Sequence, residues 1–127
     1  MIVSMSDFKL ERMKGAGTPW GGYTALVEGT QVGECAFKSA PVHGRVEIAY
    51  HTFDGFERRG FGTQMARALV AIARAAEPSL VVIAQTLRES NASTRILDKI
   101  GFTCVRTVLH PEDGEVLEWH LHPSVPV

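Results

Sequence analysis

Residues 56–63 have the sequence FERRGFGT and decide the fold, because they join the strongest strand pattern of the chain to its longest helical pattern. Arg45–Phe53 (RVEIAYHTF), just before them, is rich in β-branched and aromatic residues, which predicts a strand. After Gly62, apolar residues recur with a helical period as far as Pro78, which predicts a helix that ends there. Residues 56–63 are therefore a loop between a strand and a helix.

This loop has the composition of an anion-binding segment. Gly60 and Gly62 let the backbone approach a ligand closely, and consecutive amides before a helix N-terminus form a concavity that binds anions. Arg58 and Arg59 add local positive charge, so a pyrophosphate group would fit. The alternative is a plain turn between strand and helix. The phosphate-binding patterns GxxxxGK[ST] and GxGxxG are both absent, which disfavours an NTPase and a dinucleotide-binding domain.

Short strand patterns flank this unit on both sides. The predicted order is β-β-β-β-α-β-α-β-β, an α+β fold with a mixed sheet in which only the central strands, joined across the long helix, can be parallel. Leu80–Thr86 is an unbroken apolar run, which predicts a strand buried on both faces. Glu118, His120 and His122 are expected to be exposed on an end strand. The other strands are expected at residues 8–13, 23–28, 31–38, 102–109 and 116–121, and a second helix after Ser90 or Asn91 ends at Gly101.

Length and charge exclude several classes of protein. The chain has 127 residues, which predicts one domain over residues 1–127. Its formal net charge of −1 gives no global field toward nucleic acid or an acidic membrane, and its apolar runs are too short for a signal peptide or a membrane span. Cys35 and Cys104 have no metal-binding or redox spacing and are read as reduced thiols, so we expect a cytoplasmic protein without a metal.

Residues 92–102 (ASTRILDKIGF) follow the loop after one predicted helix and one strand, and alone they predict an amphipathic helix. Together with residues 46–50 (VEIAY) and the loop, in this order, they resemble the GNAT superfamily of acyl-CoA-dependent N-acyltransferases, in particular its Rim-type branch of ribosomal-protein acetyltransferases. The resemblance covers about residues 45–121 and, more weakly, 7–44. It implies a mixed, mostly antiparallel sheet whose two central strands splay apart, with the acyl thioester of acetyl-CoA in the gap.

The resemblance also implies which residues hold coenzyme A. In this family the loop pattern Gln/Arg-x-x-Gly-x-Gly/Ala binds the pyrophosphate mainly through backbone amides. Glu57 stands where Gln or Arg is usual, so we expect weaker binding. Asn91 lies one residue after the usual position of a family asparagine and is expected to serve in its place. The phosphates are assigned to Arg58, Arg59, Gly60, Phe61, Gly62 and Thr63, and the pantetheine arm to His51, Thr52 and Phe53.

Direct acyl transfer needs a base, because an ammonium group has no lone pair with which to attack the thioester. Glu47 is the first candidate, since a buried carboxylate in a central strand would have a raised pKa. His51 is the second and lies on the same face of a regular strand, roughly 13 Å away at about 3.3 Å per residue. The alternative for Glu47 is a structural pair with an arginine or a backbone amide.

The departing thiolate needs a proton. Leu97 stands where many family members have a tyrosine, whereas Ser93 matches a serine of the Rim-like pattern and is the candidate donor. The alternative for Ser93 is a capping or packing role.

The N-terminal part departs most from the family, whose members usually place two helices between the first and second strands. Only Lys14–Gly22 intervenes here, so the acceptor cleft is either open to a bulky amine such as a peptide end or covered by the second subunit of a homodimer. The resulting prediction is an acetyl-CoA-dependent N-acetyltransferase acting on a primary amine by direct attack in a ternary complex. The alternative is a non-catalytic acyl-CoA-binding regulatory module.

Overall fold

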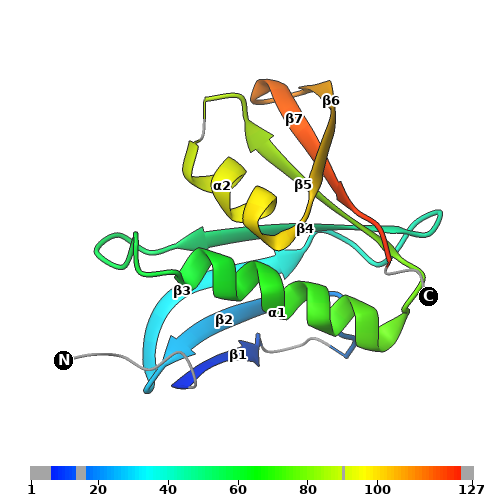
Figure 1. Ribbon diagram of the computed structural model, residues 1–127. Helices are drawn as coiled ribbons and strands as arrows, with labels where there is room; N and C mark the ends of the chain where they lie inside the picture. The colour runs from blue at the N-terminus through cyan, green and yellow to red at the C-terminus, as the bar shows by residue number, and fades with distance from the viewer. Residues whose placement is uncertain (1–6, 14–16, 90, 124–127) are drawn as a thin grey trace.

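The structure is a computed structural model that describes residues 7–13, 17–89 and 91–123, and it contains one sheet with two helices packed on the same face (Figure 1). The predicted order of elements is confirmed, and each boundary lies within one or two residues of its predicted place. The elements are β1 (Phe8–Arg12), β2 (Gly22–Val27), β3 (Thr30–Phe37), β4 (Arg45–Thr52), α1 (Phe61–Ala76), β5 (Val81–Leu87), α2 (Asn91–Ile100), β6 (Thr103–His110) and β7 (Gly114–Leu121).

The sheet has seven strands in the order β1-β2-β3-β4-β5-β7-β6. Only β4 and β5 are parallel, as predicted, and α1 forms the crossover between them. All other neighbouring strands are antiparallel, and among them only β5 and β7 are not consecutive in the chain. The β2–β3 hairpin turns through Glu28 and Gly29, whose φ values of 50° and 81° are those of a type I′ turn.

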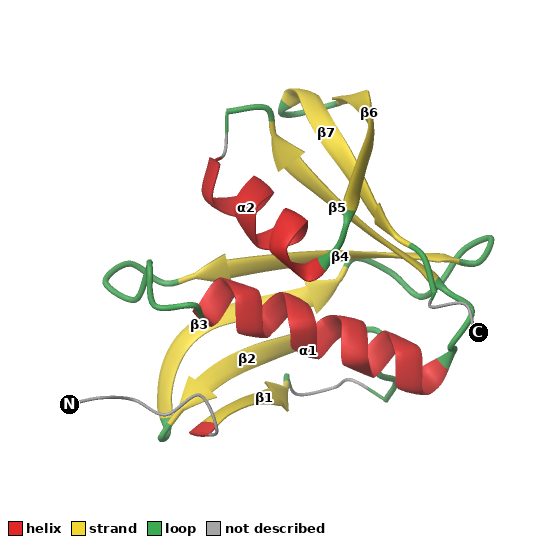
Figure 2. Cartoon of the chain, in the orientation of Figure 1, coloured by secondary structure: helices red, strands yellow, loops and turns green. Residues whose placement is uncertain are grey.

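The two central strands separate beyond their first four residue pairs. Their register runs from Arg45↔Val81 to Ile48↔Ala84 and then stops, although β4 continues to Thr52 and β5 to Leu87. In these later halves β4 is paired only with β3, and β5 only with β7. Figure 2 shows β5 and β7 rising away from the plane of β3 and β4. The gap between the strands is therefore the splayed opening that the resemblance implied.

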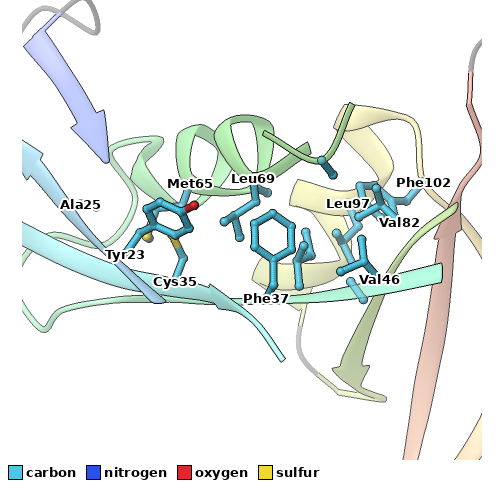
Figure 3. Packing of buried hydrophobic residues seen from close by; sticks show 14 of the residues in the cluster. Tyr23, Ala25, Cys35, Phe37, Val46, Met65, Leu69, Val82, Leu97 and Phe102 are labelled. Carbon is cyan, nitrogen blue, oxygen red and sulfur yellow. The ribbon is translucent and has the colours of Figure 1, made fainter. Parts of the chain in front are cut away.

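The hydrophobic core lies between the sheet and the two helices (Figure 3). Val46 and Ile48 of β4 face it, and Met65, Leu69 and Leu97 cover it from the helices with no exposed surface. Each such side chain contributes roughly 1.5–3 kcal/mol through burial. Because successive residues of a strand face opposite sides, the odd-numbered residues of β4 face away from the helices.

The position of β7 in the sheet differs from the prediction that it is an end strand. It lies between β5 and β6 rather than at the end of the sheet, and Glu118 and His120 are only 7% and 8% exposed. A single carboxylate oxygen of Glu118 accepts from His120 Nε2 at 2.8 Å and pairs with Arg106 Nη2 at 2.8 Å. These hydrogen bonds hold the pKa of Glu118 below its usual range, although burial alone would raise it. His122, in contrast, is exposed as expected.

The segment between β1 and β2 is short, as predicted. Its described residues, 13 and 17–21, hold no helix, so the face of the sheet opposite α1 and α2 has no helical cover from this segment. Trp20 packs edge-on against Phe37 on the core side, with ring centroids 5.0 Å apart. Neither of the helices described is long and apolar enough to span a bilayer.

Candidate functional site

A cavity of about 480 Å³ lies where the end of β4, the following loop and the first turns of α1 and α2 meet. Its β4 residues lie beyond Ile48, where β4 is no longer paired with β5. Its lining includes Tyr50, His51 and Thr52 of β4, Asp54, Phe56, Glu57, Arg58 and Gly60 of the loop, Phe61, Gly62 and Thr63 of α1, and Ala92, Ser93, Arg95 and Ile96 of α2.

The loop presents the start of α1 to this cavity. Gly60 is the N-cap, with φ 84° and ψ 6°, a left-handed conformation that favours glycine. No side chain of the described residues caps the first turn, and the turn itself contains no acidic residue. The first amides of the helix are therefore available to an anion, and the helix dipole favours one. This end of α1 fits a pyrophosphate group.

Gly62 has a packing role that the sequence did not reveal. A Cβ atom at this position would lie 2.9 Å from Ile96 Cδ1 and 3.6 Å from Thr52 Oγ1. The missing side chain thus lets the first turn of α1 approach both α2 and the end of β4. The same glycine pattern that leaves room for a ligand also brings together the three walls of the cavity.

Glu57 is part of the cavity wall, and its carboxylate takes part in the hydrogen bonds that hold the loop. One of its carboxylate oxygens accepts a hydrogen bond from the Gly55 amide at 2.9 Å. Hydrogen bonds from its own amide and from that of Gly55 hold the pKa of the carboxyl below its ordinary value, so it is ionised at neutral pH. The site therefore contains a negative charge close to the helix N-terminus.

Tyr50 belongs to the cavity and was missed by the sequence reasoning. Its side chain follows Val46 and Ile48 on the helix-facing side of β4, and burial raises the pKa of its hydroxyl to about 12. Ser93 of α2 lies beside it and has a smaller, opposite effect on that pKa. The alternation of β4 gives the face of Tyr50, but only the separation of β5 from β4 turns that position into a cavity wall.

The structure brings two of the three predicted catalytic residues to the cavity. Ser93 and His51 line it, and the His51 side chain is exposed at its rim, on the face of β4 opposite the helices. Glu47 does not line it. Its carboxylate pairs with Lys38 Nζ at 2.9 Å, which corresponds to the structural alternative with lysine in place of arginine.

Of the remaining residues that were predicted to bind coenzyme A, some line the cavity and others do not. Thr52, Arg58, Gly60, Phe61, Gly62 and Thr63 line the cavity, whereas Phe53 and Arg59 are not part of its lining. Phe53 packs near the His51 ring at 6.0 Å, and the Arg59 guanidinium lies 5.8 Å from the centre of the Phe56 ring. Asn91 is the first residue of α2, but its side chain lies outside the described part of the structure, as does Ser90.

Comparison with known proteins gives one family. The family model of the acetyltransferase (GNAT) domain matches residues 4–103. No curated protein matches the sequence.

Solved structures with the same fold are numerous but distant in sequence. RimL, a ribosomal L7/L12 alpha-N-protein acetyltransferase in complex with coenzyme A, superposes with a TM-score of 0.72 at 16% identity, over 80% of this chain and 61% of RimL. A protein from Bacillus anthracis described as a streptothricin acetyltransferase, in complex with acetyl-CoA, has a TM-score of 0.72 at 14% identity, over 93% and 83% of the two chains. The protein yncA of Salmonella typhimurium, with acetyl-CoA, has a TM-score of 0.69 at 18% identity, over 84% and 66%. This chain therefore spans about three-fifths of the length of RimL.

Proposed function

The chain belongs to the GNAT acetyltransferase family, and from that premise we propose that it transfers an acetyl group from acetyl-CoA to a primary amine by direct attack in a ternary complex. The observation that carries this proposal is the position of the cavity between the start of α1 and the region where β4 and β5 separate. One end is the uncapped N-terminus of α1, and the cavity lies beside the gap where β4 and β5 separate. A ligand with a pyrophosphate and a long arm that ends in a thioester matches this arrangement.

The first turn of α1 is proposed to bind the pyrophosphate. The amides of Phe61, Gly62 and Thr63 supply the donors, and Arg58 at the cavity wall supplies positive charge. The pantetheine arm would then run along β4 past Thr52, whose side chain lies close to Gly62. Beyond Ile48 this part of β4 has no hydrogen bonds to β5, so its free edge can pair with the amide groups of the arm.

His51 is the base that the geometry favours. Its exposed ring stands at the rim of the cavity, on the face of the sheet that the helices leave uncovered, and an amine can approach the gap from that face. Glu47 lies four residues earlier on the same face and is paired with Lys38. Because that pair already neutralises its charge, Glu47 is the weaker candidate.

Calorimetric titration of acetyl-CoA and coenzyme A tests the binding site. In Thr63→Glu, a carboxylate in the first turn of α1 repels the pyrophosphate, while the helix dipole stabilises the fold by roughly 0.3–1 kcal/mol. We expect binding to fall at least about tenfold without loss of thermal stability. Gln64→Glu adds the same charge one residue later, outside the cavity lining, and is the matched control. Equal affinities in the two variants would place the pyrophosphate elsewhere.

A second candidate function is a non-catalytic acyl-CoA-binding module. It is favoured by the ionised Glu57 at the pyrophosphate end and by Leu97, which is fully buried in the core and offers no proton donor. Release of free thiol from acetyl-CoA over a broad panel of small amines and peptide N-termini separates the two candidates. Tight binding with no release above the hydrolysis background would select the module. Light scattering shows whether the protein forms a dimer, which is necessary if a second subunit is to cover the acceptor side.

A further inference from the structure

The Tyr50 hydroxyl is a buried polar group without a geometrically satisfactory hydrogen bond among the described residues. Leaving such a group unpaired costs free energy, so a folded protein that keeps one usually uses it. The hydroxyl is placed at the cavity wall rather than inside the core. A ligand in the cavity can therefore supply the missing acceptor.

The position of Tyr50 within the cavity narrows down that acceptor. Tyr50 is two residues beyond Ile48, the last residue of β4 that pairs with β5, so it stands where the gap begins. Thr52, two residues further along β4, lies beside Gly62 at the pyrophosphate end. A ligand held by its phosphates at α1 therefore brings the distal end of its arm, the thioester, toward Tyr50. From there the carbonyl can be reached through the gap from the uncovered face of the sheet.

Helix α2 supplies the neighbour of this hydroxyl. Ser93 lies in its first turn and faces Tyr50 across the cavity lining. Leu97, one turn later, packs in the core with no exposed surface. Tyr50 and Ser93 are thus two neighbouring hydroxyl groups of the cavity lining, and Tyr50 lies two residues past the last pair of β4 with β5.

We propose that the Tyr50 hydroxyl, oriented by Ser93, donates a hydrogen bond to the thioester sulfur of acetyl-CoA and stabilises the thiolate as it leaves. This inference rests on the proposed function. In the reaction the neutral amine forms a C–N bond to the thioester carbonyl, and the C–S bond breaks with its electron pair on sulfur. The proton lost by the amine nitrogen compensates the thiolate, so the products are the amide and the free thiol.

Tyr50 acts in this step by donating a hydrogen bond and keeps its own proton. Burial raises the pKa of its hydroxyl to about 12, whereas an ordinary thiol has a pKa of roughly 8.5. Complete proton transfer from the phenol to the thiolate would therefore be uphill. A hydrogen bond to a charged partner in a poorly solvated site is nonetheless strong, and it costs no reorganisation because the hydroxyl is already in place.

The test measures the acidity of the bound coenzyme A thiol through the ultraviolet absorbance of its thiolate. All proteins carry Cys104→Ser, which removes the exposed protein thiol, while burial raises the pKa of Cys35 to about 12 and keeps that thiol silent. We expect Tyr50→Phe to lower the dissociation constant of the bound thiol proton about tenfold relative to the parent protein. Tyr23→Phe is the matched control, because the Tyr23 hydroxyl donates to the Pro19 carbonyl at 2.6 Å outside the cavity.

The turnover number kcat, the affinity for acetyl-CoA and the stability of each variant are measured alongside this titration. Tyr50→Phe is expected to lower kcat at least about tenfold with an unchanged affinity for acetyl-CoA, and to be as stable as the parent, since it removes an unpaired hydroxyl. Ser93→Ala is expected to have a smaller effect that does not add to that of Tyr50→Phe.

Two outcomes would overturn the inference. If coenzyme A binds and its thiol has the same acidity in the parent and in Tyr50→Phe, the hydroxyl does not reach the sulfur and only this inference fails. If coenzyme A does not bind the parent protein at all, the proposed function is wrong, and so is this inference, which depends on it.

Discussion

At the scale of single residues, the site combines features that attract and oppose an anion. Gly60 adopts a left-handed conformation that frees the first amides of α1, and Arg58 stands beside them. Glu57, one residue earlier, is ionised because backbone amides hydrogen-bond to its carboxylate. The glycines and the charges were predicted from the sequence as elements of a phosphate loop. The hydrogen bond that commits Glu57 to the turn at Gly55 depends on the loop conformation and was not.

Replacing Glu57 by glutamine is expected to tighten acetyl-CoA binding. Glutamine keeps an oxygen that can accept from the Gly55 amide but removes a negative charge close to the proposed pyrophosphate site. Since such a charge is largely screened by water, the expected gain is about three- to fivefold in affinity, measured by calorimetry. Glu77→Gln, at the opposite end of α1, makes the same change in net charge and is expected to leave the affinity unchanged. Equal gains in both variants would mean that only net charge matters.

At the scale of secondary-structure elements, the site depends on how closely β3, β4 and α1 approach one another. Gly33 of β3 pairs with Thr52 at the end of β4. A Cβ atom on Gly33 would lie 2.5 Å from the His51 carbonyl oxygen and 2.9 Å from Met65 Cε. The strand patterns predicted β3 and β4 almost to the residue. The lack of space for a methyl group between them results from how β3 and β4 pack together. The residue pattern of a single strand cannot predict it.

Gly33→Ala is therefore expected to destabilise the protein. The added methyl group meets the backbone of β4, which cannot move aside as a flexible side chain could, so the expected loss is about 2 kcal/mol in the free energy of unfolding. Urea denaturation measures it. Gly17→Ala is the matched control, because a Cβ there has nothing within 4 Å, and it should change stability by less than about 0.5 kcal/mol. A Gly33→Ala protein as stable as the control would show that β3 and β4 can separate without cost.

At the scale of the whole molecule, function depends on the two faces of one sheet. The helices cover the face with the core and the proposed coenzyme A cavity, and the described residues of the short segment between β1 and β2 place no helix on the opposite face. His51 stands at the rim of the cavity on that opposite face, and Glu47 lies on it in an ion pair with Lys38. On the proposed function, acceptor amines of different sizes would approach the gap from this side.

Substituting the two candidate bases tests this arrangement. His51→Gln is expected to lower kcat for amine acetylation about a hundredfold, because a general base contributes rate enhancements of roughly this size, while acetyl-CoA affinity stays the same. Glu47→Gln is expected to change kcat less than about threefold, since a half-exposed ion pair contributes little. Steady-state assays of thiol release give both values. The reverse ranking would make Glu47 the base and His51 a bystander at the rim.

The sequence by itself determined the type and order of the elements, the parallel central pair, the glycine loop between β4 and α1, and the family. The elements and the loop follow from local signals: β-branched and aromatic residues in Arg45–Phe53, a helical period after Gly62, and glycines at a strand-to-helix junction. The family came instead from the resemblance of three sequence blocks in their order along the chain. Only the tertiary structure decided that β7 lies inside the sheet and buries Glu118 and His120, that Glu47 pairs with Lys38, and that Tyr50 and Ser93 meet in one cavity. These results depend on which strands become neighbours and where β4 and β5 part. Such choices are made by packing between residues far apart in the chain, so no local pattern contains them.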